Sequence, residues 1–391
     1  MERVKLGIIG VGNMGSGHAN SLMEGKVPEL ELVAVADRRE TRRQWAKETL
    51  PDTVRIFEEG SDLIASGCCD AVLVATPHYE HPGLTIDALQ HGLHVMCEKP
   101  AGVYTKQVRE MNEAAKKSDR VFAMMFNQRT NHVYRKMHEI VCGGKYGKIK
   151  RVNWIITDWY RTQAYYNSGG WRATWAGEGG GVLLNQCPHN LDLLQWICGM
   201  PVKVQAFCHN GKWHDIEVED DVTAYLEFAD GATGVFVTTT ADAPGTNRFE
   251  ITLERGKLVC ENDQLYFYEL DVNEREYCFT ATEGFVKPSG HEVTLETDGQ
   301  NLQHVGVLRA FAANILRGEP LVARGEEGIY GLTLSNAMHL SSWLGHPVEI
   351  PFDEELFLEK LNELRSTSRL KENVQETTFS TEGSYGSEAS K

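Results

Sequence analysis

The sequence lacks any apolar run long enough to cross a bilayer, and its first residues enter a predicted strand instead of the apolar segment of a secretory signal. We therefore expect a cytoplasmic protein that does not contact a membrane. Basic residues are few, since 39 Lys and Arg stand against 55 Asp and Glu, for a formal net charge of −16. Nucleic acids and anionic membranes attract concentrated positive charge, so neither is expected as a partner.

Cysteine spacing that would indicate a disulfide framework or a metal site is also missing. The nine cysteines are odd in number and contain no C-x-x-C pair, which is typical of reduced thiols. Four histidines occur close together but belong to different predicted elements: His78, His81, His91 and His94. We predict no metal ion.

Residues 1–126 alternate short apolar runs with amphipathic stretches. This alternation predicts an α/β domain with a doubly wound parallel sheet, in which a ligand binds at the carboxyl ends of the strands. The predicted strands are Val4–Ile9, Leu32–Ala36, Val54–Phe57, Ala71–Ala75, His94–Cys97 and Val121–Met125. The predicted helices between them include Met14 to about Glu24, Thr41–Leu50, Pro82–His91 and Thr105–Lys117.

Residues 127–352 have a different texture and predict an α+β domain with a large, mostly antiparallel open sheet. A long strand is expected over Lys148–Tyr160, with hairpin turns at Asp230-Gly231 and near Arg255-Gly256. The helices are expected near 131–142, 189–198, 301–317 and 326–344. Since the second face of such a sheet needs covering, we expect a homo-oligomer, a dimer or a tetramer. Residues 353–391 should form a terminal helix followed by a polar, mobile tail.

The most informative segment follows the first predicted strand, where Gly10, Gly12 and Gly15 form a G-x-G-x-x-G motif that opens a helix. Gly10 allows a tight turn, Gly12 lets the backbone approach a pyrophosphate, and Gly15 lets the helix pack on the sheet. The first helical residues, Asn13 and Met14, bring unpaired N–H groups to the anion. In this context the motif predicts a dinucleotide site, and the alternative is a tight turn alone.

Asp37 ends the next predicted strand, twenty-two residues beyond Gly15. A carboxylate at this spacing accepts hydrogen bonds from the adenosine ribose hydroxyls and repels a 2′-phosphate, so NAD is favoured. Arg38 and Arg39 could bind that phosphate if Asp37 turned away, which keeps NADP as the less favoured alternative.

Two further segments carry candidate catalytic residues. Lys99 directly follows a predicted strand within Glu98-Lys99-Pro100, although a lysine at a strand end, taken alone, is more often a surface residue. Asn185 and His189 lie in the segment after Gly179-Gly-Gly, at the start of a predicted helix. A histidine with an ordinary pKa near 6.5 suits proton transfer, and the plain alternative is a helix-start residue bonded to backbone.

Taken in order, these motifs resemble the Gfo/Idh/MocA family of sugar and cyclitol oxidoreductases over roughly residues 1 to 350. The segments that carry the resemblance are the glycine motif, Ala75-Thr76-Pro77 with His81, Glu98-Lys99-Pro100, Trp171-Arg172 and the triple-glycine segment ending in His189. The resemblance implies a Rossmann domain, an open-sheet domain and an active site between them. It also implies cofactor contacts from Arg38, Thr76, Pro77, His81, Glu98, Lys99, Asn127, Trp171 and Arg172.

By the same resemblance, Lys99 lines the substrate site and His189 is the base for the hydroxyl that loses hydride. Many family members have an Asp four residues before this His, whereas this chain has Asn185, which cannot act as a base. Asn185 is therefore expected to fix hydroxyl geometry. Further substrate contacts are expected from Tyr160, Tyr165, Tyr166 and Arg172, although aromatic residues here can also pack the interior.

Three functions remain open at this point. The first is NAD-dependent oxidation of a secondary hydroxyl of a sugar, glycoside or inositol. The second is a redox-neutral cleavage of glycosides by oxidation, elimination and re-reduction, with Tyr165 or Tyr166 as an extra acid or base. The third is a non-catalytic NAD-binding sensor, which would have little use for both Lys99 and His189.

Overall fold

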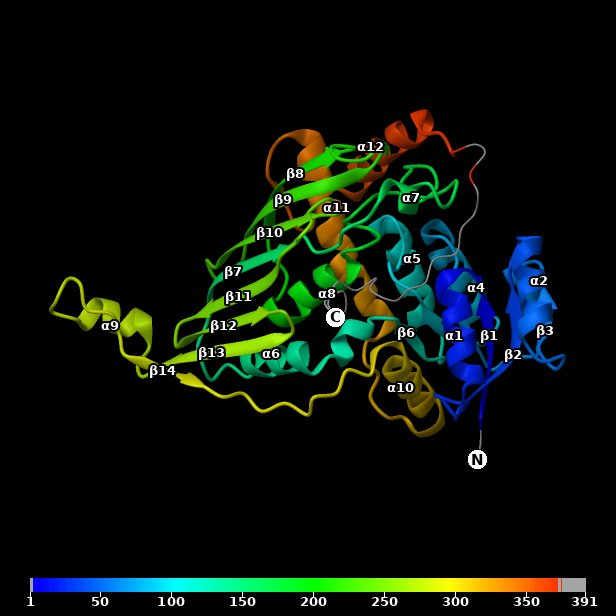
Figure 1. Cartoon of the computed structure of the whole chain (residues 1–391), viewed down its shortest axis with the longest axis horizontal. Coiled ribbons are helices and arrows are strands. Elements are labelled where there is room, and N and C mark those ends of the chain that lie inside the picture. Colours follow the sequence, from blue (N-terminus) through cyan, green and yellow to red (C-terminus); the bar gives the residue numbers. More distant parts are fainter. Residues whose placement is uncertain (1–2, 372–373, 375–391) are drawn as a thin grey trace.

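The computed structural model describes residues 3–371 and residue 374, and it contains two sheets flanked by helices (Figure 1). The first sheet is parallel throughout and has the strand order β3-β2-β1-β4-β5-β6. Its strands are β1 (Val4–Ile9), β2 (Leu30–Ala36), β3 (Arg55–Phe57), β4 (Ala71–Val74), β5 (His94–Cys97) and β6 (Phe122–Met124). The order reverses between β1 and β4, so the carboxyl ends of these strands form the switch point at which such sheets bind ligands.

The connecting segments of this first domain are mainly helical. They are α1 (Asn13–Met23), α2 (Glu40–Thr49), α3 (Gly60–Ala65), η1 (His78–Glu80), α4 (His81–Gln90) and α5 (Thr105–Lys116). The doubly wound sheet predicted for this region is confirmed. The six-residue helix α3 was not expected, because one and a half turns provide too little periodicity to recognise.

The second sheet has nine strands in the order β14-β13-β12-β11-β7-β10-β9-β8-β15. All neighbouring strands are antiparallel except β7 and β10. The strands are β7 (Ile149–Ile156), β8 (Lys203–Asn210), β9 (Glu219–Glu227), β10 (Thr233–Thr239), β11 (Asn247–Leu253), β12 (Gly256–Glu261), β13 (Gln264–Leu270), β14 (Gly290–Val293) and β15 (Val348–Glu349). The predicted α+β class and both hairpin turns are confirmed.

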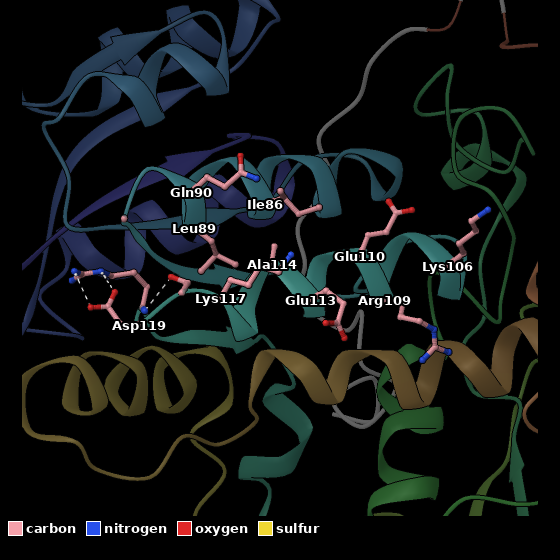
Figure 2. Close-up of a pocket in the computed structure, with 13 residues that line it drawn as sticks. Ile86, Leu89, Gln90, Lys106, Arg109, Glu110, Glu113, Ala114, Lys117 and Asp119 are labelled. Atoms are coloured by element: carbon pink, nitrogen blue, oxygen red, sulfur yellow. Dashed lines mark hydrogen bonds and ion pairs between the residues drawn. The ribbon is translucent and has the colours of Figure 1, made fainter.

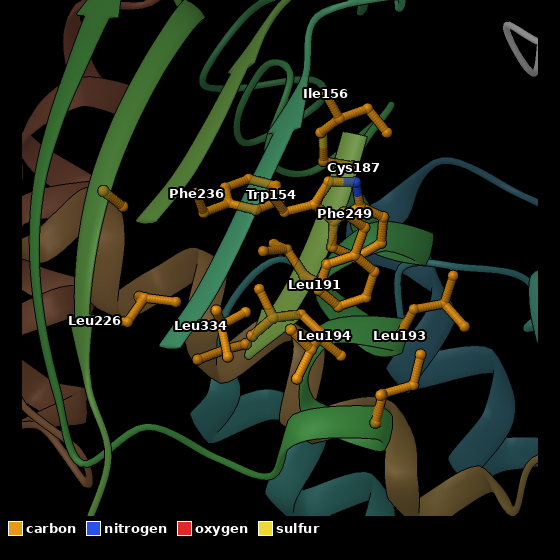
Figure 3. Packing of buried hydrophobic residues seen from close by; sticks show 14 of the residues in the cluster. Trp154, Ile156, Cys187, Leu191, Leu193, Leu194, Leu226, Phe236, Phe249 and Leu334 are labelled. Atoms are coloured by element: carbon orange, nitrogen blue, oxygen red, sulfur yellow. The ribbon is translucent and has the colours of Figure 1, made fainter. Parts of the chain in front are cut away.

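Helices cover one face of this sheet (Figure 1). The remaining elements are η2 (Asn127–Thr130), α6 (His132–Cys142), α7 (Gln163–Tyr166), α8 (Pro188–Cys198), α9 (Glu274–Thr280), α10 (Gln303–Arg317), η3 (Gly325–Glu327), α11 (Gly328–Leu344) and α12 (Glu354–Thr367). The core of the domain lies where α8 meets the sheet, and Figure 3 shows Leu191 and Leu194 against it. Trp154 of β7 stacks on Phe249 of β11 there, with ring centroids 4.1 Å apart.

The predicted strand Lys148–Tyr160 is too long, because β7 ends at Ile156. From Thr157 the chain leaves the sheet and runs into a largely irregular segment that reaches α8. Thr157, Trp159 and Tyr160, residue types common in strands, follow β7 directly, which is why the sequence suggested a longer strand. This irregular segment carries Tyr160, Tyr165, Trp171 and Arg172 to the site described below.

Helix α10 belongs to the second half of the chain but packs on the first sheet. Leu308 and Phe311 are fully buried in one cluster with Leu6 and Ile8 of β1. The expected domain limits at residues 126 and 352 stay a prediction, and α10 shows that the chain returns to the first sheet after residue 300.

The C-terminal segment after α12 lies against the irregular segment. The Ser368 hydroxyl accepts from Ala176 N at 3.0 Å, and the Lys371 ammonium donates to the carbonyl of Tyr166 at 2.7 Å. The mobile tail expected further on lies outside the described residues. Across the part of the chain that is described, no helix combines the length and the apolar character that a membrane crossing requires.

Candidate active site

The glycine motif forms the turn between β1 and α1. Gly10 has a φ of +90°, and a Cβ built there would lie 2.6 Å from the carbonyl oxygen of Ala75. A Cβ on Gly15 would overlap the Gly10 carbonyl oxygen, so α1 approaches the strand end more closely than any other residue permits. A Cβ on Gly12 would meet the end of the flexible Arg39 side chain at 3.4 Å and no other atom of the described residues within 4 Å.

The start of α1 fits the pyrophosphate of a dinucleotide. Its N-cap residue is Gly12, whose position offers no side-chain cap, so the first-turn N–H groups near Asn13 and Met14 remain available to an anion. Two buried polar atoms beyond the carboxyl ends of β4 and β6, Thr76 Oγ1 and Asn127 Oδ1, have no hydrogen-bond partner among the described residues. An open cradle with unsatisfied donors and acceptors is what a bound dinucleotide would complete.

Asp37 follows β2 and lies beside the glycine turn. Its Oδ2 accepts a hydrogen bond from Val11 N at 3.0 Å, and its Oδ1 accepts one from Arg39 N at 3.0 Å. Arg38 forms ion pairs with Glu59 at 2.8 Å and Glu80 at 2.7 Å. Because two carboxylates already neutralise Arg38, it is poorly placed to hold a 2′-phosphate.

The ends of β4 and β5 are tied together by His81. Its two ring nitrogens lie 2.7 Å from the carbonyl oxygens of Thr76 and Pro100. The ring is buried, so it fixes the Thr76-Pro77 turn relative to Glu98-Lys99-Pro100. His81, predicted to contact the cofactor, is thus placed behind these two turns.

Glu98 lies in a buried charged cluster at the end of β5. Burial raises the pKa of its carboxyl, but the hydrogen bond from His18 at 2.7 Å overcomes this effect, and the pKa falls to about 2. The His304 ring lies 5.3 Å from that of His18, and burial lowers the pKa of His304 to about 4. A carboxylate is therefore present behind Lys99 at every physiological pH.

Lys99, Asn185 and His189 come together at the end of β5. The Lys99 ammonium donates to the backbone carbonyl of Asn185 at 2.9 Å, and burial lowers the pKa of Lys99. His189 is 2% exposed at the start of α8. Burial, followed by the charge of Lys99, lowers the pKa of His189 well below its ordinary value, so its imidazole is neutral at neutral pH.

Asp192 anchors the helix that carries His189. Its two carboxylate oxygens accept hydrogen bonds from Arg129 Nε and Nη2 at 2.8 and 2.7 Å. Both side chains are almost completely buried. This bidentate pair fixes α8 against η2 and thereby the position of His189.

Tyr165 and Arg172 approach Asn185 from the irregular segment. The Tyr165 hydroxyl donates to Asn185 Oδ1 at 3.4 Å and accepts from Arg172 Nη1 at 2.7 Å. It also accepts from Gln186 Nε2 at 3.2 Å. The side-chain amide of Asn185 donates in turn to Glu178, which is 1% exposed. These contacts form one polar network from Lys99 to Arg172.

The other aromatic candidates occupy different surroundings. Tyr166 is 2% exposed, and its hydroxyl is bonded to Thr240 at 2.7 Å, so it faces the interior rather than Asn185. Tyr160 is half exposed, and Trp171 contacts His78 edge-on with centroids 6.0 Å apart. The Asn127 amide donates to Gln303 of α10.

Sequence reasoning missed Glu178, His18 and His304. Glu178 directly precedes the triple glycine and could have been noticed there, whereas His18 and His304 are separated from Glu98 by many residues and carry no local signal. A separate groove of about 820 Å³ lies between α4 and α5 (Figure 2). Charged residues such as Lys106, Arg109 and Glu113 line it, and it does not include the candidate site. Among residues 3–371 and 374, no three His, Cys, Asp or Glu side chains are arranged to hold a metal.

The six-stranded sheet, the glycine turn and the Lys99–His189 pair define a dinucleotide-dependent oxidoreductase. Family models agree: one described as the oxidoreductase family with an NAD-binding Rossmann fold matches residues 4–126, and one for the GFO/IDH/MocA C-terminal domain matches residues 134–259. The chain belongs to the Gfo/Idh/MocA family and is an NAD-dependent enzyme.

Relatives of known name cover from about half to most of the chain. Myo-inositol 2-dehydrogenase of Thermotoga maritima is 26% identical over 85% of this chain and 95% of its own length. D-glucoside 3-dehydrogenase of Escherichia coli K12 is 30% identical over 52% of this chain and 61% of its own. The WlbA dehydrogenase of Bordetella pertussis, solved with NADH and UDP-GlcNAcA, has a TM-score of 0.75 at 25% identity and covers 90% of this chain and 100% of its own.

Proposed function

We propose that this enzyme reversibly oxidises a secondary hydroxyl of a sugar, glycoside or inositol with NAD. The observation that carries the proposal is the convergence of Lys99, Asn185 and neutral His189 at the carboxyl end of β5. The named relatives that act on myo-inositol and on glucosides support this substrate class. The polar groups of Tyr165 and Arg172 suit a polyhydroxylated ring.

In the proposed reaction, His189 accepts the hydroxyl proton as the carbon loses hydride and becomes a carbonyl. Lys99 donates a hydrogen bond to the same oxygen and stabilises its developing negative charge. Asn185 fixes the orientation of the hydroxyl. NAD, when bound at the glycine turn, supplies the hydride acceptor at nicotinamide C4. Gly10, Gly12, Gly15 and Asp37 would hold the adenosine and pyrophosphate parts.

The test is NADH absorbance after mixing the protein with NAD, in parallel with NADP, and a panel of sugars, glycosides, inositols and sugar acids. We expect NADH with one compound class, formed about 10²- to 10⁴-fold more slowly by His189→Ala. Cleavage of glycosides without NADH would instead support the redox-neutral reaction. Tight NAD binding without either activity would support a sensor, and both results contradict the proposal.

We also propose that the enzyme is a homo-oligomer that works in the cytoplasm. Apolar side chains are exposed on the sheet face opposite the helices, among them Phe207, Tyr225 and Ile155. The nine cysteines are all free thiols in the described structure, which suits a reducing compartment.

A further inference from the structure

A buried carboxylate lies behind Asn185, where the chain has an amide in place of the acid of many relatives. Glu178 is separated from Asn185 by the triple-glycine turn, and its Oε1 accepts a hydrogen bond from the Asn185 side-chain amide. Gly179, the first residue of this turn, has a φ of +84°, which brings the two side chains back toward each other. The negative charge that many relatives carry at the position of Asn185 is thus supplied in this chain by Glu178, which is hydrogen-bonded to the Asn185 side chain.

The carboxylate of Glu178 is fully engaged with donors of this chain. Its Oε2 accepts from Ala173 N at 2.6 Å, and its Oε1 lies 3.7 Å from Arg172 Nη1. Ala173 has a φ of +55°, a left-handed conformation that alanine rarely adopts, so the bond to Glu178 holds the backbone next to Arg172 in an unfavourable conformation. Glu178 therefore organises both Asn185 and the Arg172 segment.

The hydrogen bond to Glu178 also decides which end of the Asn185 amide faces the site. Because Nδ2 is bound to Glu178, Oδ1 is directed to the Tyr165 hydroxyl. Asn185 consequently presents an acceptor, as a carboxylate would. An anion that accepts from the N–H of an amide increases the negative charge on the amide oxygen, so Oδ1 is a stronger acceptor than in an isolated asparagine.

We propose that Glu178 is a positioning residue for hydroxyl oxidation, which holds Asn185 Oδ1 toward the substrate and strengthens it as a hydrogen-bond acceptor. This inference rests on the proposed function. Burial raises the pKa of Glu178, and the charge of Arg172 opposes that rise. The charge of Glu98, and after it that of Glu178, raises the pKa of Lys99 against the larger effect of burial, which favours the protonated amine that the reaction requires.

The sharpest test exchanges the acid and the amide. In Glu178→Gln, the donors Asn185 Nδ2 and Ala173 N compete for one remaining acceptor oxygen, and the charge is lost. In the double variant Glu178→Gln/Asn185→Asp, the new amide donates to the new carboxylate and still accepts from Ala173 N. Both of these hydrogen bonds and the single charge are therefore kept, and only the 3.7 Å contact with Arg172 Nη1 is lost. Asn185→Asp alone places two carboxylates side by side, which cannot both ionise easily.

We expect Glu178→Gln to lower kcat by about 10- to 100-fold, the effect of one charge-assisted hydrogen bond, with NAD affinity little changed. Tm should fall as well, because one buried N–H loses its acceptor, and the double variant should restore it. Asn185→Asp should also be impaired, and the double variant should recover most of the lost kcat. Glu217→Gln is the matched control, because Glu217 holds the same segment at Trp175 N without touching Asn185, and its kcat should be unchanged.

Three results would overturn this inference. They are a wild-type kcat in Glu178→Gln, a loss of kcat matched by an equal loss of NAD affinity, and no recovery in the double variant. If Glu178→Gln does not fold, the double variant decides, and its failure to fold also contradicts the inference because its hydrogen bonds are conserved. An inactive wild-type protein would refute the proposed function itself, whereas an active one with an indifferent Glu178 would refute this inference alone.

Discussion

Burial of ionisable side chains sets the pH response of the site. His189 must be neutral to accept a proton, and its pKa is lowered by burial, so its active form persists below pH 6.5. Lys99 must be protonated to donate, and its pKa is also lowered by burial, so activity should begin to fall at a pH below 10.5. The lowered pKa values of His189 and Lys99 therefore shift the acid and the alkaline limbs of the activity profile to lower pH.

We therefore predict that kcat/KM for oxidation is level from about pH 6.5 to 8, because His189 is already neutral across this range. A histidine with the ordinary pKa near 6.5 would still be losing its proton at the lower end of the range. The measurement is the pH profile of kcat/KM in wild type and in His189→Ala. The variant should lose about 10²- to 10⁴-fold in rate together with the acid limb. An acid limb centred above pH 6.5, or one that survives in the variant, would contradict this role of His189.

We predict that Asp37 decides the choice between NAD and NADP. In the wild-type structure Arg39 Nε donates to Asp37 Oδ1 at 3.2 Å. Replacement of Asp37 by serine removes the charge that repels a 2′-phosphate and breaks this contact with Arg39. We expect the NAD to NADP preference in kcat/KM to fall by about 10- to 100-fold, as for one lost charge-assisted hydrogen bond. Kinetics with both cofactors measure the ratio, and an unchanged ratio would mean that Asp37 does not face the ribose.

At the scale of elements, the close packing of α1 on β1 depends on Gly15. In Gly15→Ala the new methyl group meets the Gly10 carbonyl oxygen, so the glycine turn must shift. We expect a loss of about 1–3 kcal/mol in stability, as in other overpacked sites, and weaker NAD binding. Denaturant unfolding and NAD titration measure the two effects.

The control for this change lies one half-turn along the same helix. Gly17 is exposed, and a Cβ there meets no atom within 4 Å among the described residues. Gly17→Ala should therefore stabilise α1 by up to about 1 kcal/mol, the helix propensity difference, without affecting NAD binding. Equal losses in both variants would show that helix packing at Gly15 is not the cause.

At the scale of the whole molecule, the open face of the nine-stranded sheet is the surface expected to join subunits. Tyr225 of β9 lies there between Gln205 of β8 and Val235 of β10, with 42% of its surface exposed. Tyr225→Glu places a charge in this face and should shift the oligomer to a smaller species in light scattering. Met23→Glu, at a 45% exposed residue of α1, should not. The reverse pattern would locate the interface elsewhere.

The sequence was most informative where structure is set by neighbouring residues. The glycine turn, the first six strands and most long helices follow from local pattern, so their positions were predicted closely. The surroundings of Lys99 could not be predicted from local pattern, because Glu98 interacts with His18 and His304, which lie far from it in the sequence. Tyr165 and Tyr166 are adjacent in sequence yet face opposite environments, which only the path of the irregular segment determines.

The central claim is hydride transfer from a substrate carbon to NAD. The most direct measurement mixes the enzyme and NAD with carbon-perdeuterated glucose or myo-inositol and determines the mass of the reduced cofactor. We predict one deuterium in the NADH formed by the wild-type enzyme and about 10²- to 10⁴-fold slower formation of reduced cofactor by His189→Ala. NADH that carries no deuterium would contradict hydride transfer from the substrate carbon. So would the absence of any NADH with both deuterated compounds and with the wider panel of sugars, glycosides, inositols and sugar acids.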